Sequence, residues 1–228
     1  MAELKKKVLG QVSGAVGDIV FRERYGLNYV GLRPSSFMPG TDAASVARRQ
    51  RFALATRVGV TINSSSQLKQ LWAAHTSSGL NAYNQIVKTN YPFVSSTDLS
   101  NLLQLTPSYG FGFVVTDSNV DRVRVRTTID PIGTNTGIDP ALEPNLMLTC
   151  LVFLTSPIDL SLAPYSLMAV SSALQATNLA TEFTVDANLT NQQQVVFDNY
   201  QVTKTFVALV TLDAIGNPMH YSSTALLV

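Results

Sequence analysis

Hydrophobic and polar positions follow three patterns along the chain, and the first consists of short β-prone stretches between glycines. Residues 8–33 contain five glycines, at positions 10, 14, 17, 26 and 31. Residues 19–24 and 28–33 flank Tyr25-Gly26-Leu27, so a β-hairpin with glycine in its turn is predicted. Because an isolated two-stranded ribbon is marginal in water, we expect this hairpin to pack on its own domain or on another subunit.

The second pattern is helical and covers residues 41–91. Thr41 or Asp42 can cap a first helix, and Ser64–Ser66 offers a cap for a second. Gly79 interrupts the periodicity, which restarts and then ends at Tyr91-Pro92. The three expected apolar faces consist of Val46, Phe52, Leu54, Ala55 and Val58; of Leu68, Leu71, Trp72 and His75; and of Leu80, Tyr83, Ile86 and Val87.

The third pattern, from about residue 111, is that of short strands. Residues 112–116 and 121–129 flank a turn-rich stretch at 117–120, and Val123, Val125 and Thr127 alternate with Arg122, Arg124 and Arg126. Residues 146–154 form an unbroken apolar run that is typical of a central strand. Further strands are predicted at 165–170, 182–187, 194–197, 205–213 and 220–227.

Together these patterns predict an α+β fold. A Gly-rich N-terminal arm and β-hairpin (1–40) and a segment of short helices (41–104) precede an antiparallel, immunoglobulin-like β-sandwich (105–228). The Cys…Trp…Cys spacing of antibody domains is missing, so an antibody-type domain is not predicted.

Charge divides the chain into two unlike halves, although only 14% of its residues are charged and its net charge is +1. Residues 1–91 hold twelve Lys and Arg against four acidic residues, a net charge of +8, whereas residues 92–228 hold four against eleven, a net charge of −7. The basic half can meet a polyanion, or it can meet the acidic half of a neighbouring copy, which needs no outside partner. The candidate subunit-interface residues are Arg22, Arg24, Arg33, Arg48, Arg49 and Arg51.

Residues that carry chemistry are sparse. The single cysteine, Cys150, lies in the apolar run 146–154 and is expected to be buried, and two histidines are too few for a metal cluster. No dinucleotide fingerprint, phosphate loop, nucleophile elbow or close carboxylate pair is present. His75 is expected to be a packed structural histidine. We therefore predict no catalytic, metal-binding or cofactor-binding residues and no enzymatic activity.

No stretch approaches the roughly 18 apolar residues of a membrane span, so none is predicted. Lys5, Lys6 and Lys7 look like the start of a signal peptide, but residues 8–18 are too polar and too rich in glycine for its hydrophobic region. No signal peptide is therefore predicted.

Several motifs in order carry a family resemblance. These are Gly10-Gln-Val-Ser-Gly-Ala-Val-Gly-Asp-Ile-Val-Phe-Arg22, Asn28-Tyr-Val, Arg33-Pro34, Thr41, Arg49-Gln-Arg-Phe-Ala-Leu54 and Ala82-Tyr-Asn84. Residues 8–91 thereby resemble a family of uncharacterised bacterial and phage-associated proteins, whose members continue into an immunoglobulin-like β region. The chain departs from the family pattern at residues 42–45, where the family often has Thr-x-Ala-Gln, and in the direct succession of Arg33 and Pro34. The resemblance implies an architecture and an assembly role rather than a reaction.

The sequence thus favours a non-enzymatic structural subunit that self-assembles into a virion, a tail-like particle or a surface filament, with copies of itself as partners. One alternative is a module that binds a cell-surface glycan or protein through exposed aromatics, for which Tyr165, Tyr200 and Tyr221 are candidates scattered along the sequence. Another is nucleic-acid packaging through the basic half, although no aromatic stacking positions alternate with the arginines.

Overall fold

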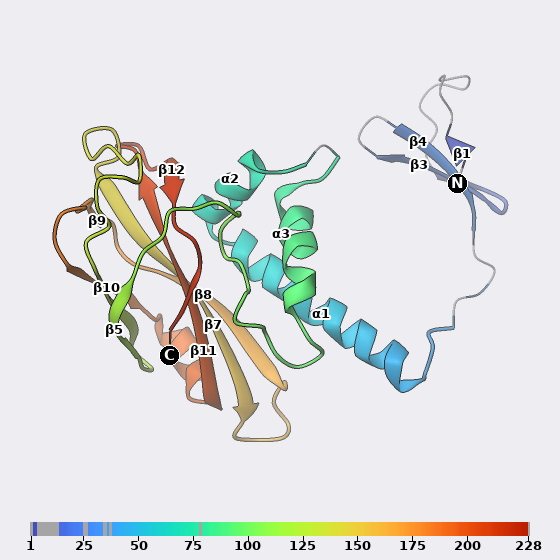
Figure 1. Cartoon of the computed structure of the whole chain (residues 1–228). Helices are drawn as coiled ribbons and strands as arrows, with labels where there is room; N and C mark the ends of the chain where they lie inside the picture. The colour runs from blue at the N-terminus through green and yellow to red at the C-terminus, as the bar shows by residue number, and fades with distance from the viewer. Residues whose placement is uncertain are drawn as a thin grey trace. The chain divides into compact units, whose positions relative to one another are not determined.

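The computed structural model describes residues 2–3, 14–24, 27–33, 36, 38–77 and 79–227. The chain forms two compact units, Met1–Val46 and Ala47–Val228 (Figure 1). The glycine-rich stretch at 8–13, the expected turn residues Tyr25 and Gly26, and Pro34 lie outside the described residues.

The N-terminal unit contains one four-stranded antiparallel sheet in the order β1-β4-β3-β2. The expected hairpin is confirmed as β3 (Ile19–Arg24) and β4 (Leu27–Leu32), in which Phe21 pairs with Val30. β2 (Gly14–Val16) and β1 (Ala2–Glu3), which the sequence did not predict, pair with its two edges. Gly17 has a φ of +57° in the tight turn between β2 and β3, a conformation that favours glycine.

Three helices follow, as predicted: α1 (Ala43–Asn63), α2 (Ser66–Ala74) and α3 (Ala82–Asn90), which leads into the 3-10 turn η1 (Tyr91–Phe93). The Asp42 carboxylate accepts a hydrogen bond from the Ser45 backbone N–H (2.8 Å), and Ser65 caps α2 through the N–H of Leu68. The capping predictions at Asp42 and Ser65 are therefore confirmed.

Two residues of the predicted helix faces are exposed. The buried face of α1 runs along Leu54, Ala55, Val58, Gly59 and Ile62, which leaves Phe52 56% exposed at its flank. His75 is the C-cap of α2 and is exposed, but its ring packs edge-on against the Tyr221 ring at 5.3 Å between centroids.

The second unit also contains two antiparallel sheets. The smaller has the order β10-β6-β5, with β5 (Val115–Val120), β6 (Arg124–Ile129) and β10 (Phe183–Asn188). The larger has the order β12-β11-β7-β8, with β9 paired to β7 and β13 paired to β11. Its strands are β7 (Asn145–Pro157), β8 (Tyr165–Ser171), β9 (Gln175–Ala176), β11 (Tyr200–Leu212), β12 (Pro218–Tyr221) and β13 (Ala225–Leu227).

Two hydrophobic cores flank the central pair β7 and β11. On one face Met147 and Phe206 pack with residues of the helices, among them Trp72, whose indole N–H donates to the Leu105 carbonyl (2.8 Å). On the other face Leu148 and Val207 pack with the smaller sheet. A strand buried on both faces needs apolar residues at consecutive positions, which explains the unbroken run at 146–154. Buried Cys150 lies in this run as predicted, and its burial raises the pKa of its thiol.

The fold is α+β, with helices and two antiparallel sheets in one compact second unit. Segments 41–104 and 105–228, which the sequence separates by pattern, share the core between the helices and the larger sheet. Figure 1 shows the helices lying against this sheet.

Three strand predictions are wrong in detail. The strand predicted at 220–227 is interrupted and forms the end of β12 and the separate β13. Residues 194–197 belong to the helix α4 (Asn191–Phe197), because Thr190 and Gln193 form a reciprocal capping box at its start. The predicted turn at 117–120 is part of β5; the chain turns at 121–123 instead, where the Asp121 carboxylate accepts hydrogen bonds from the N–H groups of Val123 and Arg124.

Candidate functional site

The six candidate interface arginines are distributed over both units. Arg22 on β3 and Arg33 just after β4 are exposed in the N-terminal unit, and the side chain of Arg24 lies outside the described residues. Arg48 and Arg49 are exposed on α1 in the second unit. Two of the three candidate arginines on α1 are thus exposed.

The third of these arginines, Arg51, binds within its own chain. Its Nη2 donates to the carbonyl oxygens of Tyr91 (2.9 Å) and Pro92 (3.4 Å). Its guanidinium carbon also lies 4.4 Å from the centroid of the Tyr91 ring, a cation–π geometry. Arg51 therefore joins α1 to η1, whatever it contributes to an interface.

Several charged residues of the acidic half pair with one another. The guanidinium of Arg126 binds the carboxylate of Asp186 through two hydrogen bonds (2.8 and 2.9 Å), and Arg124 lies 3.4 Å from the same carboxylate. The hydrogen bonds from Arg126 lower the pKa of Asp186, against the opposing effect of burial. Lys204 pairs with Asp98 at 3.0 Å. These basic groups are neutralised inside the chain.

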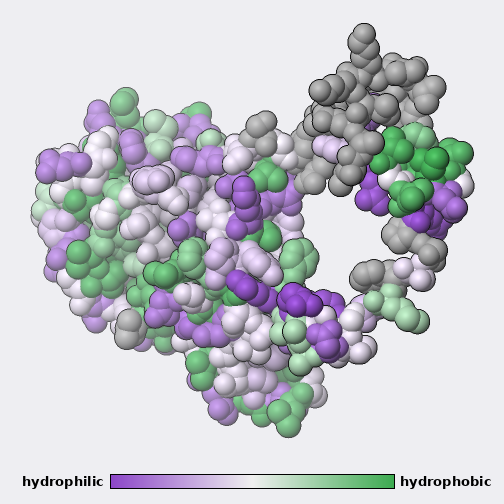
Figure 2. Space-filling view, turned by 45° about the vertical axis from the view of Figure 1, so that its right-hand side comes forward, coloured by the Kyte–Doolittle hydropathy of each residue, from purple (hydrophilic) through white to green (hydrophobic). Residues whose placement is uncertain are grey.

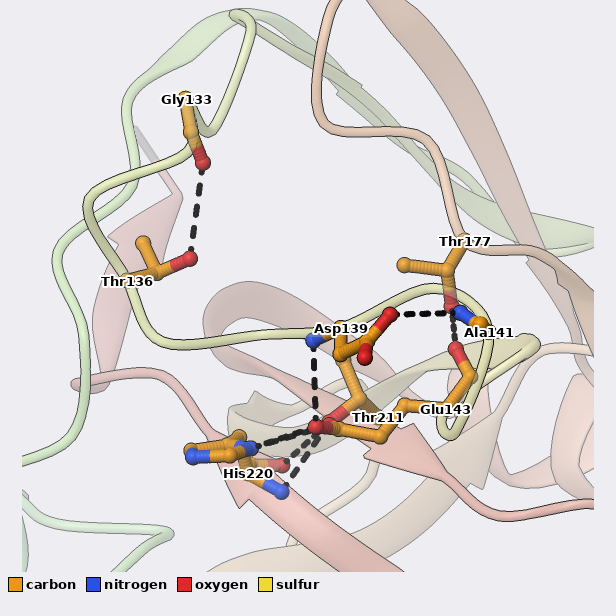
Figure 3. Close-up of polar contacts among 8 residues, drawn as sticks. All are labelled: Gly133, Thr136, Asp139, Ala141, Glu143, Thr177, Thr211 and His220. Carbon is orange, nitrogen blue, oxygen red and sulfur yellow. Dashed lines mark hydrogen bonds and ion pairs between the residues drawn. The ribbon is translucent and has the colours of Figure 1, made fainter.

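The most concentrated polar chemistry surrounds Glu143, whose side chain is only 3% exposed (Figure 3). Nδ1 of His220 lies 2.8 and 3.0 Å from its two carboxylate oxygens, and the hydroxyl of Thr211 donates to the carboxylate as well. The hydroxyl of Thr177 donates to the backbone carbonyl of Glu143 (2.6 Å). These bonds fix the loop before β7 to β11 and β12.

His220 also lines a cleft of about 460 Å³ at the surface of the second unit. Its side chain is 43% exposed, and the buried carboxylate orients the ring through Nδ1. Asn135, Thr136 and the aromatic Tyr221 line the same cleft. Nε2 of His75 lies 3.0 Å from the Tyr221 hydroxyl, and burial raises the pKa of Tyr221.

This arrangement can orient an imidazole toward a polar ligand, in the way that a carboxylate orients histidines in proton-transfer sites. Cys150 lies in the core and does not contribute a nucleophile to it. Within the described ranges, no cluster of three or more His, Cys, Asp or Glu is placed to hold a metal ion. The cleft therefore offers binding groups and one oriented histidine.

Sequence reasoning missed Glu143 and treated His220 as one of two scattered histidines. The two residues lie 77 positions apart in the sequence. They meet only in the fold, where β12, which contains His220, pairs with β11 and the loop before β7 contributes Glu143. The one feature of the sequence that could have pointed to this site is the position of the acidic Glu143 shortly before the apolar run 146–154.

In the part of the chain that the structure describes, no helix is long and apolar enough to cross a membrane. No family model, no curated protein and no solved structure matches this chain.

Proposed function

We propose that the protein is a non-enzymatic structural subunit that self-assembles into a larger particle or filament through its N-terminal sheet. One observation carries the proposal: among the described residues of this sheet, none is buried. Val16 is 68% exposed and Leu32 80% exposed. Figure 2 shows hydrophobic residues at the surface of the N-terminal unit. Such side chains gain free energy when a partner covers them, at roughly 25 cal/mol per Å² of apolar area.

The open edges of the sheet support the same proposal. β1 and β2 are its outermost strands, so each has one side without a neighbour in the sheet's strand order. Unpaired strand edges are templates for another strand, and strand addition is a common mode of protein association. A neighbouring chain can therefore extend this sheet.

The occupant that we propose is a second copy of the chain. The basic half of the sequence is complementary in charge to its acidic half, so head-to-tail contacts between copies satisfy both. Asp159 and Asp213 stand in surface loops of the acidic half, and hydrogen bonds from Ser161 and Asn217 lower their respective pKa values. These carboxylates stay charged at neutral pH and can meet arginines of a neighbour. A virion or an extracellular assembly remains the expected location.

We also propose that the two sheets of the second unit are of immunoglobulin-like type. If the two-residue β9 is left out, seven strands run in order from β5 to β12. The first, second and fifth share one sheet, and the third, sixth and seventh share the other. This is the division of strands A, B, E and C, F, G in immunoglobulin domains. The fourth strand, β8, differs from strand D of the constant type, because it pairs with the third strand and not with the sheet of A, B and E.

Assembly of the full chain tests the proposal. We expect negative-stain microscopy and sedimentation velocity to detect rings, tubes or shells, and Val16→Asp with Leu32→Asp to reduce them strongly. Leu160→Asp is the matched control, because Leu160 is 97% exposed in the second unit and its change leaves assembly intact. Monomers at all salt and protein concentrations would contradict self-assembly. Equal loss in both variants would contradict the role of the sheet.

A further inference from the structure

A second cleft, of about 410 Å³, lies between α1, α3, β8 and the start of β11. It belongs wholly to the second unit and shares no lining residue with the cleft at His220. Its size falls within the range of small-molecule sites, which measure roughly 300–1,000 Å³. The cleft is therefore a candidate binding site independent of the N-terminal sheet.

Three tyrosines from three elements meet in this cleft: Tyr83 of α3, Tyr165 of β8 and Tyr200 of β11. Tyr165 and Tyr200 were scattered candidates in the sequence, and the fold brings them together. Among the described residues, no partner accepts or donates a hydrogen bond at the hydroxyls of Tyr83 and Tyr165, and both residues line the cleft. Aromatic rings with free hydroxyls offer apolar faces and polar groups at once.

The tyrosines are held in place before any ligand binds. The Tyr165 ring packs against Phe153 at 6.0 Å between centroids, and the Tyr200 hydroxyl donates to the Ala163 carbonyl (3.0 Å). Tyr83 packs closely on α1 because Gly59 has no side chain: a Cβ there would lie 3.1 Å from a Tyr83 ring carbon. Preorganised rings lose little conformational entropy on binding.

The cleft also contains one cation. The guanidinium carbon of Arg57 lies 5.3 Å from the centroid of the Tyr165 ring, at the edge of cation–π range. Arg57 is exposed, and no carboxylate of the described residues forms an ion pair with it, whereas Arg122, Arg124 and Arg126 are all paired. Its planar guanidinium can therefore donate two hydrogen bonds to the two oxygens of a ligand carboxylate.

We propose that this cleft binds a carboxylate-bearing sugar, such as a uronic or sialic acid residue of an acidic glycan. A sugar ring has apolar C–H faces that cover aromatic rings and hydroxyls that bond to phenol oxygens, and its carboxylate fits Arg57. A single arginine suits one negative charge rather than the several of a di- or triphosphate. A compact inorganic anion would leave three aromatic rings unused.

The experiment uses the full chain and the methyl glycosides of glucuronic acid and N-acetylneuraminic acid, with their uncharged methyl esters as counterparts. Binding is followed by saturation-transfer NMR and by titration calorimetry. We expect at least one acid to bind up to about fivefold more tightly than its ester, because Arg57 is exposed and solvent screens an exposed ion pair. Absence of binding by both acids, equal affinity for acid and ester, or tighter binding of a nucleoside monophosphate would overturn the proposal.

Three variants locate the interaction. Arg57→Gln is expected to bring the affinity for the acid down to that for the ester, whereas Tyr165→Leu, which keeps an apolar contact with Phe153, is expected to weaken both. Arg122→Gln is the matched control, since Arg122 is an exposed arginine elsewhere in the second unit. Because Arg57 is exposed, its variant is expected to fold normally. Acid binding that survives Arg57→Gln, or that Arg122→Gln weakens equally, would place the ligand elsewhere.

Discussion

The two units of this chain differ in how far they bury their own apolar side chains. In the second unit, β7 and β11 are covered on both faces, and Phe206, Val207 and Leu209 are fully inaccessible to solvent. In the N-terminal unit, none of the described side chains reaches that state, although its strands contain Val, Ile, Phe and Leu. Burial is the main favourable contribution to folding, so the second unit is stabilised internally and the first gains most from a partner.

A pair of matched substitutions tests this contrast most strongly. Phe206→Ala removes a fully buried side chain and is expected to lower the free energy of unfolding by about 3–5 kcal/mol. Phe21→Ala removes the same group from β3, where Phe21 is only half-buried, and is expected to cost far less in unassembled protein. Urea denaturation of both variants gives the comparison. Similar losses would show that the N-terminal sheet is stabilised as strongly as the second unit.

The next effect is expected at Glu143. Glu143→Ala leaves the hydroxyl of Thr211 and the ring of His220 without their shared acceptor. Hydrogen bonds to a charged group contribute about 1.5–3 kcal/mol, so the free energy of unfolding should fall by roughly that amount. Glu182→Ala is the control, because Glu182 is exposed and binds only the Thr116 hydroxyl among the described contacts. Equal denaturation midpoints for the two variants would argue against a locking role for Glu143.

Surface charge on α1 should affect the rate of assembly rather than the stability of the fold. Arg48→Glu with Arg49→Glu reverses two exposed charges, and we expect slower assembly at low salt and a smaller difference at high salt. The Debye length shrinks from about 10 Å at 0.1 M to about 3 Å at 1 M salt, which screens such contacts. Arg51 is left unchanged because it binds the carbonyls of Tyr91 and Pro92.

Light scattering of nuclease-treated protein measures this effect, with Lys69→Glu on α2 as a control for charge alone. If the double variant assembles at the wild-type rate at low salt, electrostatic attraction does not guide the docking of subunits. Loss of polyanion binding without any change in assembly would instead favour nucleic-acid packaging as the role of these arginines.

The smallest expected effect concerns pH and the pair Arg126–Asp186. The pKa of Asp186 is lowered in the folded chain, chiefly by hydrogen bonds from Arg126, so its stabilisation is present above the ordinary carboxylate value of about 3.9. It is lost as the pH falls through the lower folded value. Both side chains are about one-third exposed, so the difference between the wild type and Asp186→Asn should stay below about 1 kcal/mol. Denaturation at pH 6 and pH 2.5 measures it, and a difference that does not shrink at the lower pH would contradict this origin.

The pattern of hydrophobic and polar positions correctly predicted elements with one buried face and one exposed face, and elements buried deep in the core. The caps at Asp42 and Ser65 and the run at 146–154 have strong local causes, and all of them are confirmed. Residues 194–197 were misassigned because Gln-Val-Val-Phe has β-prone composition, whereas the decisive signal, the Thr190–Gln193 box, precedes them.

The candidate sites were less predictable than the fold. Glu143 and His220 meet only through the sheet, and Tyr83, Tyr165 and Tyr200 meet only in the cleft that α3, β8 and β11 line together. A one-dimensional pattern contains residue types but not these long-range contacts. Arg57 illustrates the point: in the sequence it is one of several arginines on a helix, and in the structure it lies in a cleft beside an aromatic ring.

The shared central strands have a consequence for how the second unit opens. Residues that alternate along β7 belong to one core and then to the other, so neither core can be lost while β7 and β11 keep their pairing and their neighbours. Amide protons that bond between β7 and β11 should therefore exchange with solvent only when the whole unit unfolds, whereas amides of the N-terminal sheet should exchange through local opening until neighbouring subunits protect them.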